Sequence, residues 1–148
     1  MDSLNRLFIA LIMHRHNFQM IHWNVVGDHF DSVHTITDEY QSKMSDDIDL
    51  VAEFMKMRDP HVHIPTIVEA IDQIKEDDHE HLIVQSDNHI SCETAWKLTE
   101  KIFDELIELC DEARPDCPSD IQSEIDGMMY YYRKEGRYKC SSRLSHDD

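Results

Sequence analysis

Residues 28–59, which follow Gly27, contain neither glycine nor proline. Apolar side chains recur through this stretch every three or four residues, which is the spacing of one face of an α-helix. The pattern predicts one long helix over residues 31–58, with Asp31 as its N-cap. Pro60 and Pro65 end it, because proline lacks the amide hydrogen that a helix interior needs.

The same periodicity predicts three more long helices and one short helix. Asp2 or Ser3 caps the first, and Gly27 stops it, since glycine readily adopts the left-handed conformation that follows many helix ends. No strand pattern is found. The expected helices are 3–25, 31–58, the short helix 67–75, 91–113 and 119–134.

Four long helices, with the short one between the second and third, predict an all-α fold: a ferritin-like four-helix bundle. The 148 residues are enough for a single domain with a hydrophobic core. We expect one domain over residues 1–148, with 135–148 as an irregular tail.

The chain is strongly acidic, with 31 acidic and 14 basic side chains and a formal net charge of −17. Such a surface repels nucleic acid and attracts cations, although many ordinary soluble surfaces are also acidic. Four cysteines without CxxC spacing favour free thiols. No signal peptide and no apolar run of about 18 residues are found, so we expect a cytoplasmic protein that avoids membranes.

Five side chains of the kinds that bind metal ions stand in or beside the long helix. His22 and His34 lie about equally far from the turn between the first two helices, so an antiparallel hairpin brings both imidazoles to one place. Asp38 lies one turn beyond His34 on the same face. Asp49 and Glu53 are also one turn apart and form a pair of carboxylates.

The imidazoles and the carboxylates cannot bind one ion within a single straight helix. His34 and Asp49 are fifteen residues apart, which is about 22 Å along a helix, whereas zinc or iron needs its donors at about 2 Å. Two readings stay open. The two groups are unrelated, as most helical histidines and solvated acidic pairs are, or a second copy of the chain, laid antiparallel across a twofold axis, supplies the missing half.

A di-iron site inside one bundle does not fit this sequence. That design needs a glutamate on each of two helices and a Glu-x-x-His motif on each of the other two. The expected first helix has no glutamate, and Glu76-x-x-His79 is the only Glu-x-x-His motif in the sequence. We therefore reject the intrachain version.

The region around these ligands strongly resembles the Dps family, the miniferritins named as DNA-binding proteins from starved cells. The resemblance is specific over residues 18–55, in identity, order and intervals, and beyond them it is mainly architectural. The residues that carry it are His22, Trp23, Asn24, Val25, Gly27, Phe30, His34, Asp38, Asp49, Leu50, Val51, Ala52 and Glu53.

The resemblance implies a hollow dodecamer with iron-oxidising (ferroxidase) sites between subunits. His22 and His34 come from one subunit and Asp49 and Glu53 from its twofold mate, while Asp38 helps to place the iron. The implied reaction is Fe(II) oxidation, typically by hydrogen peroxide, followed by storage of ferric mineral and protection against oxidative stress. Fe is the implied metal, with Zn as a possible substitute.

Other segments are interpreted against the family pattern. Asp116, Asp120 and Glu124, near the start of the last helix, are candidates for iron-entry pores or for solvated helix caps. Many family members bind DNA through a basic N-terminal tail, which we do not expect here because few residues precede the first expected helix. The basic residues of 133–143 are expected to give little DNA binding at physiological salt. The histidines between 61 and 89 are read as exposed polar residues, with Zn or stray Fe binding as the alternative.

Two other functions are weighed against an iron-oxidising shell. The first is a non-catalytic Dps-like assembly that compacts DNA or acts as a scaffold. The second is a metal buffer that uses its many histidines without redox chemistry. The complete set of four ligands favours the iron-oxidising shell, and the missing basic arm argues against DNA compaction.

Overall fold

The structure is a computed structural model that describes residues 2–76 and 89–144, and this part of the chain is almost entirely helical. In chain order its elements are α1 (Ser3–Asn24), β1 (Val25–Val26), α2 (Phe30–Arg58), α3 (Ile67–Glu76), β2 (Ile90–Ser91), α4 (Cys92–Ala113), a 3₁₀ turn (Arg114–Asp116), α5 (Ser119–Tyr132), a π-helical segment (Arg133–Cys140) and α6 (Ser141–Leu144).

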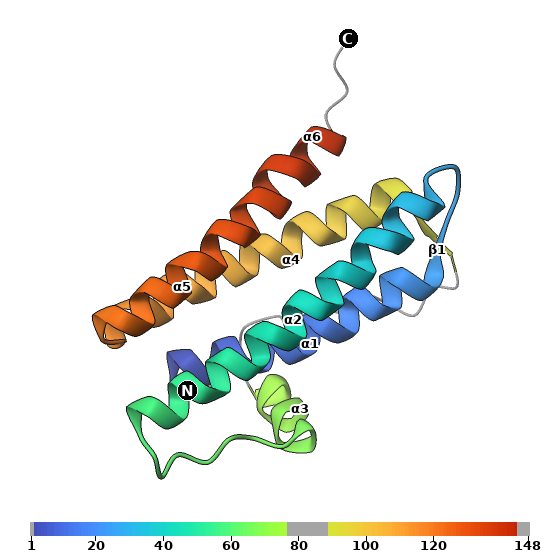
Figure 1. Cartoon of the computed structure of the whole chain (residues 1–148). Coiled ribbons are helices and arrows are strands. Elements are labelled where there is room, and N and C mark those ends of the chain that lie inside the picture. The colour runs from blue at the N-terminus through green and yellow to red at the C-terminus, as the bar shows by residue number, and fades with distance from the viewer. Residues whose placement is uncertain (1, 77–88, 145–148) are drawn as a thin grey trace.

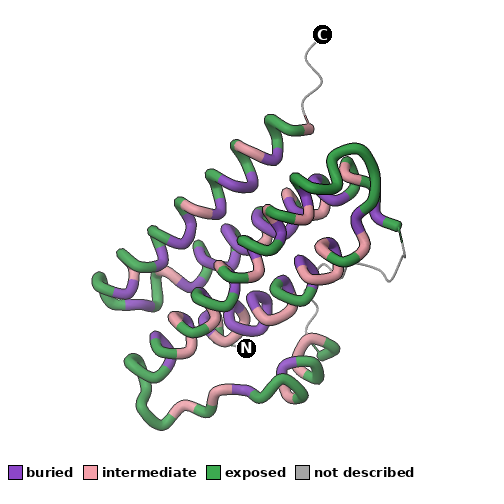
Figure 2. The backbone as a smooth tube through the Cα atoms, turned by 45° about the vertical axis from the view of Figure 1, so that its right-hand side comes forward, coloured by how far each residue is buried: buried purple, intermediate pink, exposed green. Residues whose placement is uncertain are grey.

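The helices form the predicted bundle. Helices α1 and α2 pack against each other as a hairpin, and α4 packs against α1 and against the long rod made by α5, the π-helical segment and α6 (Figure 1). The short helix α3 lies between the second and third long helices of the chain, as the sequence predicts. Figure 2 shows buried residues facing the interior of the bundle and exposed ones facing outward.

One aromatic side chain from each long helix meets in the middle of the core. Phe18 of α1 lies 5.1 Å from Tyr40 of α2 and 5.5 Å from Phe103 of α4, measured between ring centroids. Phe103 also stacks on Tyr132 of α5 at 5.7 Å. None of the four is exposed to solvent. Rings of this size dominate the apolar area that a small core buries, so they hold the four helices in register.

The chain reverses between α1 and α2 at Gly27, whose φ of 118° is a conformation that favours glycine. The amide of Phe30 then donates to the carbonyl of Gly27 at 3.1 Å, and α2 begins at Phe30. The expected cap, Asp31, is therefore wrong: the N-cap position is His29, which makes no side-chain cap bond. Asp31 lies in the first turn, where a carboxylate still favours the positive end of the helix.

The expectation of no strands is wrong at one place. Strand β1 pairs in parallel with β2, with Val25 opposite Ile90, and both side chains are buried. This contact holds the start of α4 beside the α1–α2 turn. Two residues are too few to show a periodic pattern, so the sequence carried no signal for this ladder.

The expected irregular tail is wrong for residues 135–144. The chain continues from α5 as a π-helical segment and then as α6, with Glu135, Gly136 and Cys140 buried. A Cβ on Gly136 would lie 2.6 Å from the Cβ of Phe103, so only glycine allows this close approach to α4. The polar composition of the segment hid its buried face, and residues 145–148 lie outside the described part.

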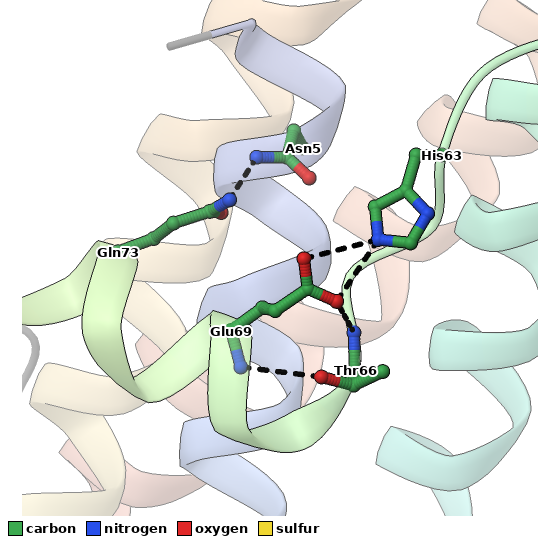
Figure 3. Close-up of polar contacts among 5 residues, drawn as sticks. All are labelled: Asn5, His63, Thr66, Glu69 and Gln73. Atoms are coloured by element: carbon green, nitrogen blue, oxygen red, sulfur yellow. Dashed lines mark hydrogen bonds and ion pairs between the residues drawn. The ribbon is translucent and has the colours of Figure 1, made fainter.

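Hydrogen bonds close the first turn of helix α3, and a side-chain hydrogen bond joins the helix to α1 (Figure 3). The amide of Thr66 donates to Glu69 at 3.1 Å, and the amide of Glu69 donates to the Thr66 hydroxyl at 3.3 Å, which is a capping box. Asn5 of α1 donates to Gln73 at 3.0 Å. The helix buries Ala70, while Ile67, Val68 and Ile71 face solvent and leave much of its apolar face uncovered.

Two simpler expectations concern membranes and thiols. Within the described ranges, no helix combines the length and the apolar composition that a membrane span requires. All four cysteines are free thiols, as their spacing predicted: Cys92, Cys110, Cys117 and Cys140.

Candidate metal centre

The α1–α2 hairpin brings His22 and His34 into direct contact. His22 lies in the last turn of α1 and His34 near the start of α2. Their ring centroids are 3.7 Å apart and their planes differ by 17°, so the imidazoles are stacked. The ring of Phe30 also stacks on His34, with centroids 4.9 Å apart. The sequence prediction that the hairpin unites the two imidazoles is confirmed.

Each imidazole is bonded to the backbone of the other. The Nδ1 atom of His22 lies 2.7 Å from the carbonyl oxygen of His34. In the same way, the Nδ1 atom of His34 lies 2.9 Å from the carbonyl oxygen of His22. A carbonyl oxygen only accepts hydrogen bonds, so both Nδ1 atoms must carry the proton and donate. The lone pair of each neutral ring is then on Nε2, which is the tautomer that a metal-binding histidine with an Nδ1–H partner presents.

The stacking limits how the two rings can share metal. An imidazole binds an ion in the plane of its ring, along the nitrogen lone pair. Because the planes of His22 and His34 are nearly parallel and the centroids are 3.7 Å apart, an ion in one plane lies well outside the other. This arrangement suits two ions, one for each imidazole, better than one ion between both.

The carboxylates stand on the same helix but away from the imidazoles. Asp38 is exposed, one turn from His34, and Asp49 and Glu53 are exposed one turn apart toward the other end of α2. Helix α2 is unbroken between these groups, so His34 and Asp49 stay about 22 Å apart. In the described part of one chain, no three histidine, cysteine or acidic side chains are grouped to hold a metal ion.

A fully buried acid, Asp47, stands among these exposed carboxylates. Burial raises the pKa of Asp47, and two neighbours lower it in part. The Tyr132 hydroxyl donates to one carboxylate oxygen, and the Nζ atom of Lys43 lies 3.1 Å from the other. Sequence reasoning missed Asp47, because nothing in a run of acidic residues marks the one that points inward. It also did not single out Thr37, whose hydroxyl oxygen lies 3.2 Å from Nδ1 of His22.

The remaining candidate ligands are scattered. Asp116, Asp120 and Glu124 are all exposed near the start of α5, and Asp120 accepts from the amide of Ile121 at 2.9 Å. Their role as pore residues stays a prediction. Among the histidines between 61 and 89, His63 is hydrogen-bonded to Glu69, and His61 and His89 are exposed. His79 and His81 lie outside the described residues.

Known proteins match this chain in structure but not in sequence. No protein-family model and no curated protein sequence matches it. The crystal structure of Dps from Staphylococcus aureus superposes with a TM-score of 0.80 over 98% of this chain and 94% of that one, at 19% identity. A Dps protein from Bacillus brevis gives 0.79 over 97% and 93%, at 20% identity.

The chain has the Dps fold. Antigen TpF1 from Treponema pallidum shares it, with a TM-score of 0.82 over 97% of this chain and 90% of that one, at 14% identity. The resemblance first noted over residues 18–55 is thus confirmed as a likeness of fold over nearly the whole chain. In this Dps fold, the stacked histidines mark one end of α2 and the paired carboxylates lie toward the other.

Proposed function

We propose that two copies of this chain pair across α2 and oxidise Fe(II) at sites that the two chains share. The observation that carries the proposal is the placement of two incomplete ligand sets along one unbroken helix. His22 and His34 present imidazole nitrogens near its start. Asp49 and Glu53 present carboxylates about 22 Å away, so a complete set requires a second chain.

A twofold axis across α2 completes both sets at once. In an antiparallel pair, the start of each α2 lies beside the far end of the other, and one axis makes two equivalent sites. His22 and His34 of one chain then face Asp49 and Glu53 of its mate. Asp38 is exposed one turn from His34, and we assign it the role of guiding an ion toward the imidazoles, beside the four ligands.

Exposed apolar side chains beside both ligand sets support this pairing. Trp23, next to His22, is 62% exposed, and Met57, one turn beyond Glu53, is 61% exposed. The uncovered apolar face of α3 follows Met57 along the chain. An antiparallel pair would bring the exposed Trp23 of one chain toward the exposed Met57 of its mate, and removal of these apolar side chains from water would favour the pairing.

The ligand chemistry suits iron as substrate. Neutral imidazole nitrogens and carboxylate oxygens together form a mixed set that binds Fe(II), and carboxylates stabilise the more highly charged Fe(III) that forms. Two Fe(II) ions give one electron each to one hydrogen peroxide, and with two protons this yields two Fe(III) and two waters. Transfer of both electrons in one site avoids release of a hydroxyl radical.

Storage follows from assembly of the pairs into a closed shell. We propose a cytoplasmic dodecamer whose acidic interior collects ferric ions, in line with the Dps fold of the chain and its net charge of −17. The exposed carboxylates Asp116, Asp120 and Glu124 lie near one end of α5 and would line an entry route there. Zn(II), which prefers the same donors, would compete with iron.

The test begins with anaerobic Fe(II) loading of the purified assembly, followed by hydrogen peroxide. Ferric absorbance reports oxidation, and particle size reports the shell. His34→Ala and Asp49→Ala are each expected to abolish fast oxidation while the assembly persists. Asp111→Ala is the control, because Asp111 is an exposed carboxylate on α4, outside the proposed set and off α2, and it is expected to retain wild-type rates.

Mixing the two inactive variants distinguishes a shared site from two separate ones. A pair formed from one His34→Ala chain and one Asp49→Ala chain keeps one complete set, so oxidation is expected to return after disassembly and reassembly of the mixture. Native mass spectrometry verifies that mixed assemblies form. A confirmed mixed assembly that remains inactive would contradict the shared site.

A further inference from the structure

We infer that Thr37 is a positioning residue that orients the imidazole of His22 for metal binding. The inference takes its purpose from the proposed iron site, but the contact itself is a feature of the metal-free chain. Thr37 lies three residues after His34 on α2 and is completely buried. Its hydroxyl oxygen lies 3.2 Å from Nδ1 of His22, across the helix hairpin.

The hydroxyl proton of Thr37 is committed to its own helix. The oxygen lies 2.7 Å from the carbonyl oxygen of Val33 and 3.2 Å from that of His34. The shorter distance identifies Val33 as the acceptor of the single hydroxyl proton. Thr37 therefore turns a lone pair, and no proton, toward His22.

Nδ1 of His22 thus faces two acceptors. One is the carbonyl oxygen of His34 at 2.7 Å and the other is the Thr37 hydroxyl at 3.2 Å. Both require the proton on Nδ1, which leaves the metal-binding lone pair on Nε2. The two acceptors also lie in different directions from the ring. Together they therefore restrict rotation of the His22 imidazole about its Cβ–Cγ bond more than the carbonyl alone would.

The chain supplies a matched control for this role. Thr99 of α4 is equally buried and donates to the carbonyl of Ala95 at 2.7 Å, the same bond to the fourth residue back that Thr37 makes. Replacing either threonine with valine removes a buried hydroxyl of the same kind from a helix. Thr37→Val removes an acceptor from His22 as well, whereas Thr37→Ser keeps it.

The experiment uses the assembled full-length protein and Co(II), which takes similar donors and has visible absorption bands. Co(II) titrations give the affinity of wild type, Thr37→Val, Thr37→Ser and Thr99→Val. Loss of a hydrogen bond behind a metal-binding histidine typically weakens binding by about tenfold or more, so Thr37→Val is expected to weaken Co(II) about tenfold. Thr37→Ser and Thr99→Val are expected to stay close to wild type.

Solid-state NMR of histidine-labelled, metal-free assemblies gives the second readout. The ring-nitrogen shifts of His22, assigned by comparison with His22→Gln, are expected to show one well-defined Nδ1–H form in wild type and altered or broadened signals in Thr37→Val. Unchanged shifts and affinity in Thr37→Val, or an equal loss in Thr99→Val, would overturn the inference. If wild type binds no Co(II), the proposed iron site fails, while the NMR comparison still decides the Thr37 contact.

Discussion

The hydroxyl of Tyr132 donates a hydrogen bond to the carboxylate of Asp47 inside the bundle, where neither side chain is exposed to solvent. The bond joins α5 to α2 and fixes which face of α2 turns inward. Successive residues of a helix are about 100° apart, so Asp49 lies about 200° around the helix from Asp47. Burial of Asp47 therefore helps to turn Asp49 outward, toward the proposed partner chain.

Removing this hydroxyl is expected to destabilise the fold. Tyr132→Phe leaves one buried carboxylate oxygen of Asp47 without its donor, while Lys43 still lies beside the other oxygen; the loss costs about 1–3 kcal/mol of the free energy of unfolding. Urea unfolding at one fixed protein concentration measures the change, because assembly also affects apparent stability. Tyr130→Phe is the control, since Tyr130 is 69% exposed. Equal stability of both variants would mean that the Asp47 bond contributes nothing.

Gly127 of α5 and Gly136 of the π-helical segment are expected to respond in opposite ways to replacement by alanine. At Gly136 a Cβ would meet the Cβ of Phe103 at 2.6 Å, so Gly136→Ala is expected to destabilise the protein by about 1–3 kcal/mol through overpacking. At Gly127 a Cβ would meet nothing within 4 Å. Gly127→Ala is expected to stabilise α5 by up to about 1 kcal/mol, and thermal unfolding of both variants tests the contrast.

The capping box of α3 is expected to give a pH-dependent contribution to stability. Hydrogen bonds from His63 and then from Thr66 lower the pKa of Glu69 from its usual 4.5 to about 2. A lowered pKa means that the folded state favours the carboxylate. Its contribution is therefore complete above about pH 4.5 and is lost as the pH falls toward 2.

The measurement is the melting temperature of wild type and Glu69→Gln between about pH 6 and pH 3. Wild type is expected to be the more stable at the upper end, and the difference is expected to shrink as the pH falls. Asp72→Asn, an exposed carboxylate on the same helix, controls for the loss of one charge. A difference that stays constant over this range would rule out the carboxylate of Glu69 as its cause.

DNA retention is expected at low salt only. Arg133 and Lys134 are exposed beside Tyr130 and Tyr138, where α5 passes into the π-helical segment. The net charge of −17 opposes binding of any polyanion. Phosphate contacts weaken steeply as salt displaces them. A gel-shift series from low to physiological salt tests this, and complexes that persist at physiological salt would favour a DNA-compacting role instead.

The candidate site could be read from the sequence where the argument depends on distance along a helix. The absence of glycine and proline between Gly27 and Pro60 predicts an unbroken α2, and the rise per residue then separates His34 from Asp49 whatever surrounds them. The symmetric placement of His22 and His34 about the turn likewise predicts their contact. Both predictions follow from local helix geometry, which depends only on the order of residues in one chain.

The contacts between side chains of different helices could not be predicted without the tertiary structure. The helical run of residues 135–144 depends on the packing of Gly136 against Phe103, and burial of Asp47 depends on Tyr132, 85 positions later. The order of residues alone predicts the helices and the spacing of the ligands, because both follow from local repeats. Only the packed bundle decided which polar groups point inward and which backbone atoms hold the two imidazoles, because those contacts join residues that no local pattern connects.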